Sequence, residues 1–151
     1  MEIEYIKLEN TRSRREMLKA FLHDKSEEFA EPLENRINVS NYAEKLLLNG
    51  YVFAAVHEKK IMGIIGGYAN DFENFQAYES ILVTDRMLRG SGAAKILFQM
   101  QKVYCKEQGM RTIYFTTNRG NAAAIKFYNK MNVPVVQDLC NTKVIAYVLR
   151  I

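Results

Sequence analysis

Two periodicities of hydrophobic and polar residues run through this chain, and each predicts a different kind of element. Short runs rich in apolar and β-branched residues, some alternating with polar ones, are typical of strands. These runs cover residues 2–8, 51–57, 61–69, 76–84, 112–117, 133–139 and 143–149. Apolar residues spaced three and four apart are typical of amphipathic helices. They occur over residues 12–22, 42–49, 93–108 and 121–131.

The residues between these segments predict caps, turns and one irregular stretch. Ser40 or Asn41 is expected to cap the second helix, because short polar side chains accept hydrogen bonds from free helical N–H groups. The charged residues 58–60 predict a hairpin, and Asn141-Thr142 predicts a turn near the C-terminus. The polar stretch of residues 23–38 predicts irregular structure.

In the helix of residues 93–108, the spacing of apolar residues predicts one buried face. Its expected members are Ala93, Ile96, Leu97, Met100, Val103 and Tyr104. Gly109 can end this helix, because glycine readily adopts the left-handed conformation found just beyond helix C-termini.

The predicted order of elements is β-α-α-β-β-β-α-β-α-β-β. A strand–helix–strand crossover follows three strands that can pair antiparallel, so we expect an α/β chain whose mixed sheet holds parallel and antiparallel pairs. No internal repeat, low-complexity tract or linker divides the 151 residues. The sequence therefore predicts a single domain over residues 1–151.

Composition and charge narrow the class of protein. Hydrophobic residues make up 48% of the chain and charged residues 25%, as in ordinary globular proteins. No apolar run approaches the roughly 20 residues that span a bilayer, and the first residues lack the pattern of a signal peptide. We therefore expect a cytoplasmic protein without membrane contact. The two cysteines have no metal-like spacing, so no metal site is expected.

A glycine loop between the strand of residues 76–84 and the helix of residues 93–108 carries the first candidate chemistry. Its residues are Arg89, Gly90, Ser91, Gly92, Ala93 and Ala94. Such a loop turns the free N–H groups of a helix N-terminus, with the positive end of the helix dipole, toward an anion. Glycines let the backbone approach that anion closely, because no Cβ intervenes. The GxGxxG fingerprint of dinucleotide-binding proteins and the Gly-Lys-Ser/Thr of P-loops are both missing from the sequence.

Two motifs together resemble those of the GNAT N-acetyltransferase family. The loop fits the pattern (Arg/Gln)-x-x-Gly-x-(Gly/Ala), and the matching residues are Arg89, Gly92 and Ala94. A later stretch contains Asn-x-x-Ala-x-x-Phe-Tyr, and its matching residues are Asn121, Ala124, Phe127 and Tyr128. One predicted strand separates the motifs. The order of elements resembles the GNAT fold over essentially the whole chain.

The resemblance implies that acetyl-CoA lies between two splayed strands, with its pyrophosphate in the glycine loop. Backbone N–H groups on the strand of residues 76–84 would then bind the pantetheine arm and stabilise the oxyanion that forms during acetyl transfer. The residues expected to bind acetyl-CoA are Ile81, Leu82, Val83, Arg89, Gly90, Ser91, Gly92, Ala93, Ala94, Asn121, Ala124 and Phe127.

The resemblance also implies direct attack of an amine on the thioester, with a general acid and a base as candidate catalytic groups. Tyr128 is the expected general acid, because a phenol with a pKa near 10 can protonate the leaving thiolate. Glu79 is the candidate base, and strand alternation predicts that it shares a face with Ile81. The two histidines are weaker candidates, and solvent serves as the base in many members of the family.

The acceptor side is less well defined by the sequence. In GNAT proteins the first two helices and their connection form an acceptor wall, which makes Phe29, Leu33 and Arg36 the candidate contacts here. Residues 68–75 are a second candidate wall. We expect the acceptor to be a primary amine of a small molecule, while an amino sugar, a polyamine, an amino acid and a protein N-terminus all remain open.

Two other function classes stay open at this point. One is a non-catalytic module on the same fold that binds coenzyme A or regulates, although the presence of Tyr128 and Asn121 argues against it. The other is a nucleic-acid binder, which would need a basic stripe beside stacked aromatic residues. The net charge is only +4 and the basic residues are dispersed, so no nucleic-acid partner is expected. Unpaired edges at the terminal strands make a homodimer a further expectation.

Overall fold

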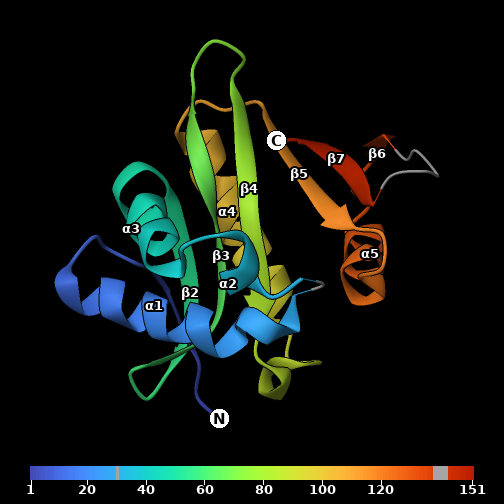
Figure 1. Ribbon diagram of the computed structural model, residues 1–151. Helices are drawn as coiled ribbons and strands as arrows, with labels where there is room; N and C mark the ends of the chain where they lie inside the picture. The colour runs from blue at the N-terminus through green and yellow to red at the C-terminus, as the bar shows by residue number, and fades with distance from the viewer. Residues whose placement is uncertain (30, 138–142) are drawn as a thin grey trace.

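The computed structural model describes residues 1–29, 31–137 and 143–151 (Figure 1). The strands are β1 Glu4–Lys7, β2 Tyr51–His57, β3 Lys60–Asp71, β4 Gln76–Thr84, β5 Thr112–Asn118, β6 Val135–Gln137 and β7 Val144–Arg150. The α-helices are α1 Arg12–Lys25, α2 Leu33–Arg36, α3 Val39–Asn49, α4 Ala93–Glu107 and α5 Ala122–Lys130. Two short 3₁₀ turns, η1 Ser26–Glu28 and η2 Arg86–Leu88, follow α1 and β4. No helix among the described residues is both long and apolar enough to cross a membrane.

All the described strands form one sheet, in the order β1-β2-β3-β4-β5-β7-β6. Neighbouring strands pair antiparallel except for β4 and β5, which are parallel and joined by α4. A parallel pair needs such a crossover, because its two strands run in the same direction. The predicted mixed sheet and its α/β class are therefore confirmed.

The single parallel pair is short, and the two strands then separate. Only the first three residues of β4, Gln76 to Tyr78, are paired with β5, at Thr112 to Tyr114. Beyond this point β5 is paired with β7, and β4 is paired with β3. Figure 1 shows β5 diverging from β4 toward α5, so no strand of the described residues pairs with the lower half of β4 on that side. Its backbone there is available to bind another extended chain.

Helices cover both faces of the sheet. A core cluster on one face joins α1, α2 and α3 to β2, β3 and β4 through residues such as Leu18, Leu46 and Ile64. The core on the other face joins α4 and α5 to the sheet through residues such as Leu97 and Tyr128. Figure 1 shows α1 and α2 in front of the sheet and α4 behind it.

Most element boundaries agree with the sequence prediction to within about two residues, and the larger differences lie in and directly after the stretch expected to be irregular. There α1 continues to Lys25, and α2 forms a further turn at Leu33–Arg36. The cap of α3 was predicted wrongly, because Asn38 caps it: its Oδ1 accepts a hydrogen bond of 3.0 Å from the Asn41 N–H. The predicted turn at Asn141-Thr142 lies outside the described residues.

The predicted buried face of α4 is also wrong in part. Ile96 and Val103 are 40% and 57% exposed. The buried residues of α4 are Ala93, Leu97, Phe98, Gln101 and Cys105. The sheet thus contacts a row of residues spaced four apart, which begins at Ala93 and ends at Cys105. This row includes Gln101, which a search for apolar residues overlooks. Burial of Gln101 is tolerated because its amide is hydrogen-bonded, as described below.

A β-bulge in β4 changes the face to which its side chains point. Gly66 of β3 is opposite Ile81, whereas the next residue, Gly67, is opposite Glu79, so Ser80 is an extra residue on β4. Glu79 therefore faces α4 and α5, while Ile81 joins the core beneath α1 and α3. The expectation that Glu79 and Ile81 share a face is wrong for this reason. Gly67 allows the close approach, since a Cβ there would lie 1.9 Å from the Tyr78 carbonyl oxygen.

Candidate active site

A buried carboxylate on β4 forms the centre of the candidate site. Glu79 is 5% exposed and lies next to the point where β4 and β5 separate. The Tyr128 hydroxyl donates a hydrogen bond of 2.8 Å to its Oε2, and the Gln101 amide donates one of 2.8 Å to its Oε1. The two residues that the sequence proposed as acid and base therefore contact each other directly.

The second motif positions Tyr128 against this carboxylate. Asn121 caps α5, and its Oδ1 accepts a hydrogen bond of 3.0 Å from the Ala124 N–H. Two turns later, the Tyr128 ring packs on Phe115 with a centroid separation of 4.5 Å, and only 4% of the residue is exposed. This aromatic packing holds the ring, so the hydroxyl reaches across from α5 to β4.

Burial shifts the pKa of both groups upward. It raises the pKa of Glu79 to about 7, although the hydrogen bonds from Gln101 and Tyr128 oppose the shift. It raises the pKa of Tyr128 well above the ordinary value, and the negative charge of Glu79 acts in the same direction. Near neutral pH the carboxyl can therefore take up or release a proton, whereas the phenol holds its proton.

The glycine loop has the backbone geometry of an anion site. Gly90 and Gly92 have φ values of +76° and +82°, and a Cβ on either would meet nothing within 4 Å. Gly92 is the N-cap of α4, whose first N–H groups have no partner within the helix. Of these, the Ala93 N–H donates to the Ser91 hydroxyl at 3.2 Å. The N–H groups that follow, of Ala94 and Lys95, lie at the positive end of the helix dipole.

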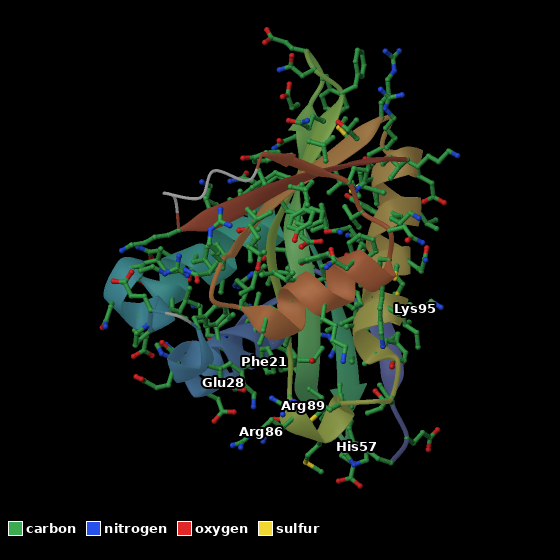
Figure 2. The ribbon with its side chains drawn as sticks, turned by 90° about the vertical axis from the view of Figure 1, so that its right-hand side faces the viewer. Phe21, Glu28, His57, Arg86, Arg89 and Lys95 are labelled. Carbon is green, nitrogen blue, oxygen red and sulfur yellow. The ribbon has the colours of Figure 1, made fainter. Side chains whose placement is uncertain are left out.

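Cationic side chains surround this loop, and an ion pair anchors it. Figure 2 shows Arg86 on η2, Arg89 at the start of the loop and Lys95 on the first turn of α4, and all three side chains are exposed. Lys25 at the end of α1 binds Asp85 with an Nζ–Oδ2 distance of 2.5 Å. The other carboxylate oxygen of Asp85 accepts a hydrogen bond from the Met87 N–H, which fixes the start of the loop.

The remaining residues predicted to bind the donor lie along one path. Ile81, Leu82 and Val83 are on the part of β4 that has no pairing with β5. The Phe127 ring packs edge-on against Phe98 of α4, at a centroid distance of 5.9 Å. Ala124 is partly buried in the same core as Phe127. The path thus runs from the glycine loop, along the free edge of β4, to α5.

The residues predicted for the acceptor side differ in their environment. Leu33 is 4% exposed and packs in the core beneath α1 and α3, so it presents little surface to a ligand. Phe29 is partly buried against the same core. Arg36 is exposed, and it lies close enough to Tyr42 and Tyr78 for its charge to oppose the rise in their pKa that burial causes.

Sequence reasoning missed a cluster of tyrosines on the α3 side of the bulge. Tyr78 and Tyr114 are paired at the last position before β4 and β5 separate, and their rings stack at 6.1 Å. The Tyr42 hydroxyl lies 2.5 Å from the hydroxyl of Ser80, the extra residue of the bulge. The pairing of Tyr78 with Tyr114 was accessible from strand register alone, but the contact of Tyr42 with Ser80 depends on the bulge.

The two histidines have partners away from Glu79. His57 Nδ1 lies 2.8 Å from the Glu2 carbonyl oxygen, at the end of β2. His23 of α1 is paired with Glu34 of α2. Neither ring is among the groups that contact Glu79, so neither histidine joins the pair formed by Glu79 and Tyr128.

Comparisons with known proteins bear on the family and the fold of the chain. A model of the acetyltransferase (GNAT) family matches residues 14–132. A GNAT acetyltransferase from Staphylococcus aureus Mu50 is 23% identical, with a TM-score of 0.79 over 99% of both chains. The ribosomal-protein-S18-alanine N-acetyltransferase from Escherichia coli is 14% identical, with a TM-score of 0.74 over 99% of this chain and 94% of that one. An aminoglycoside 6'-N-acetyltransferase complexed with coenzyme A is 17% identical, with a TM-score of 0.76 over 99% and 97%.

No curated protein sequence matches the chain. At these identities the solved structures show a shared fold, and the family model shows the family, because it spans most of the chain and includes both motifs. The chain belongs to the GNAT acetyltransferase family.

Proposed function

We propose that this chain is an acetyl-CoA-dependent N-acetyltransferase that acetylates a primary amine of a small molecule. In this proposal Glu79 is the general base and Tyr128 is the general acid. The observation that carries it is the hydrogen bond of 2.8 Å between these two side chains, next to the free edge of β4. Family membership supports acetyl transfer, and the pair supplies the proton chemistry that acetyl transfer needs.

The shape of the site fits acetyl-CoA. The free edge of β4 offers backbone N–H and C=O groups to an extended pantetheine arm, in the way that one strand binds another. At one end of this edge, the N-terminus of α4 and the basic residues Arg86, Arg89 and Lys95 suit a pyrophosphate. At the other end lie Glu79 and Tyr128, which would place the thioester beside them. Asn121 uses its Oδ1 to cap α5, which leaves its Nδ2 to donate to the arm.

The contact between Glu79 and Tyr128 lets the site return to its starting state after each transfer. Glu79 takes a proton from the amine nitrogen as that nitrogen bonds to the acetyl carbon. Tyr128 gives its proton to the sulfur as the carbon–sulfur bond breaks. The proton on Glu79 can then pass along the hydrogen bond to the Tyr128 oxygen. The net result is one proton moved from the amine to the thiol, with both side chains unchanged.

The tyrosine cluster supports a compact acceptor on the α3 side of the gap. Tyr78 and Tyr114 give a stacked aromatic surface, and the exposed Arg36 adds a positive charge near it. An amine with an apolar or ring-shaped body would contact these rings while its nitrogen reaches the gap between β4 and β5. Arg36 therefore remains our candidate acceptor contact, whereas the buried Leu33 would act by packing.

Turnover with a panel of amines tests the proposed function directly. We expect release of free thiol from acetyl-CoA to rise above the rate of hydrolysis with at least one small primary amine. Amino sugars, polyamines, amino acids and peptides with a free N-terminal alanine form the panel. Coenzyme A binding without turnover of any amine would favour the non-catalytic module, and turnover of the peptides alone would contradict the small-molecule acceptor.

Replacement of Gly92 by asparagine tests the site of the pyrophosphate. Asparagine tolerates a positive φ, so the change adds a side chain over the loop with little backbone strain. We expect the Kd of coenzyme A, measured by calorimetric titration, to rise about tenfold, which corresponds to about 1.4 kcal/mol.

The matched control for Gly92→Asn is Gly109→Asn. Gly109 also has a positive φ, of +89°, and open space around its Cβ position. It lies beyond the other end of α4, about 25 Å away at 1.5 Å per residue. We expect this variant to bind coenzyme A normally. If both variants bound coenzyme A with equal affinity, the proposal that the loop binds the pyrophosphate would be wrong.

A further inference from the structure

A chain of buried hydrogen bonds leads from Glu79 into the core, away from the gap between β4 and β5. Gln101 of α4 donates from Nε2 to Glu79 Oε1 at 2.8 Å, and its Oε1 accepts from the Tyr51 hydroxyl at 2.7 Å. Gln101 is completely buried, and Tyr51 of β2 is 1% exposed. The donor-binding path and the tyrosine cluster do not include either residue.

The two ends of the Gln101 amide differ chemically, and its neighbours determine which way it lies. An ionised carboxylate only accepts hydrogen bonds, so the amide must present its NH₂ group to Glu79. Its carbonyl oxygen then faces β2, where the Tyr51 hydroxyl donates to it. Without this donor, the buried oxygen would lack a partner, at a cost of about 1–3 kcal/mol. Tyr51 therefore stabilises the orientation in which Gln101 supports the charged form of Glu79.

We propose that Tyr51 and Gln101 are positioning residues, which hold the Glu79 carboxylate ionised and directed at Tyr128. The proposal extends the function proposed above, because it assigns to these residues the control of the general base. Neither residue touches the reacting atoms, and Tyr51 acts only through Gln101.

Hydrogen bonds are the main support for the charge of Glu79, because the titratable groups around it are neutral. The groups close enough for the charge of Glu79 to raise their pKa are the phenols of Tyr51, Tyr78 and Tyr128, from β2, β4 and α5, and the thiol of Cys105, from α4. Phenols and thiols with raised pKa values are neutral at pH 7. The pKa of Glu79 is shifted by burial and by the hydrogen bonds from Gln101 and Tyr128, with no contribution from a cation among the described residues. Removing one of the two donors should therefore raise this pKa.

Titration of the Glu79 carboxyl provides a test that does not depend on activity. The protein is labelled with ¹³C at the glutamate side-chain carboxyls, and the Glu79 signal is assigned from its loss in Glu79→Gln. We expect Gln101→Met to raise the pKa of Glu79 by about one unit. Tyr51→Phe, which keeps the ring and removes only the hydroxyl, should raise it by less. The double variant should shift it no further than Gln101→Met, because the two residues act in series.

The pH dependence of kcat gives the second measurement. The ascending limb of the profile should move upward with the pKa of Glu79, so Gln101→Met loses about tenfold at pH 6 and recovers at pH 9. Gln99→Met, an exposed change on the same helix, and Tyr104→Phe are the matched controls, and both should behave like the wild type.

Three results would decide against one or other proposal. An unchanged pKa of Glu79 in both Gln101→Met and Tyr51→Phe would overturn the positioning role. Additive shifts in the double variant would overturn the action of Tyr51 through Gln101. A shifted pKa with an unmoved kcat profile would support the positioning role and would remove Glu79 as the base, so failure of the proposed function is distinguishable. Tyr51→Phe keeps the test available if Gln101→Met does not fold.

Discussion

Glu79→Gln is expected to lower kcat about 100-fold or more while making the folded protein more stable at pH 8. The amide cannot take the proton of the amine, and general base catalysis is commonly worth 10² to 10⁴ in rate. The KM for acetyl-CoA should change little, because the glycine loop and the β4 backbone are unaltered. Steady-state kinetics with the best amine of the panel measures both quantities.

The stability gain of this variant follows from the raised pKa of Glu79. Its pKa rises from 4.5, the ordinary value, to about 7 in the folded protein. Between these values the folded state keeps a proton that the unfolded state has lost, so the free energy of unfolding falls as the pH rises through this window. The fall amounts to about 3 kcal/mol and is complete above pH 7. Glu79→Gln lacks this fall and should melt at a higher temperature than the wild type at pH 8, but not at pH 4.5.

Glu73→Gln, at an exposed position in the turn between β3 and β4, is the matched control. It should leave kcat and the pH dependence of the melting temperature at wild-type values. A Glu79→Gln protein with normal kcat would show that solvent accepts the proton of the amine. If the melting temperatures of Glu79→Gln and wild type depended equally on pH, the raised pKa of Glu79 would not be the cause of the loss of stability.

Tyr128→Phe is expected to lower kcat about 100-fold, with little change in the affinity for coenzyme A. The phenylalanine ring keeps the packing on Phe115 and Tyr147, so only the hydroxyl and its proton are lost. The leaving thiolate must then take its proton from water, and general acid catalysis of this kind is commonly worth 10² to 10⁴. A loss in kcat with unchanged Kd marks an interaction that acts in the transition state.

A second readout separates proton donation from a packing defect in Tyr128→Phe. In an analogue of coenzyme A whose thiol is more acidic, the thiolate leaves without being protonated. The acetyl thioester of such an analogue should therefore restore much of the rate that Tyr128→Phe loses. Tyr104→Phe, in a partly buried tyrosine on α4, serves as the control and should retain normal kcat. Equal losses with both thioesters would assign Tyr128 a structural role.

Sequence alone predicted those parts of the fold that follow from local periodicity. The bounds of β2 and β4 agree with the runs at 51–57 and 76–84, because β-branched and apolar residues fill these buried strands. The helix that bears Tyr128 agrees as well, since Asn121 is a strong N-cap. Glu79 and Tyr128 were found from a family motif and a strand position, although nothing in the sequence showed that they touch.

The parts that sequence missed depend on contacts between distant segments. The bulge at Ser80 arises where Gly67 lets two backbones approach closely. Strand alternation gives Ser80 a register position of its own, which the bulge removes. Gln101 interrupts an apolar face, and only its partners Glu79 and Tyr51, 22 and 50 residues away, explain why it is buried. Leu33 lies in a stretch that the sequence predicted as irregular. Its burial results from the packing of α2 against α1, which local periodicity does not show.

The extra residue in β4 also determines how this strand can change in length. Side chains alternate between the two faces of a strand, so one inserted residue reverses the face of every residue on one side of it. The bulge makes that reversal between Glu79 and Ile81, and so the carboxylate faces α5 while the residues beyond it pack beneath α1. Deletion of Ser80 would make Glu79 and Ile81 direct neighbours opposite Gly67 and Gly66, and ordinary alternation would keep them on opposite faces. Loss of this one residue would therefore shorten the strand without turning the carboxylate away from α5, whereas loss of a residue elsewhere in β4 would reverse the faces on one side of the deletion.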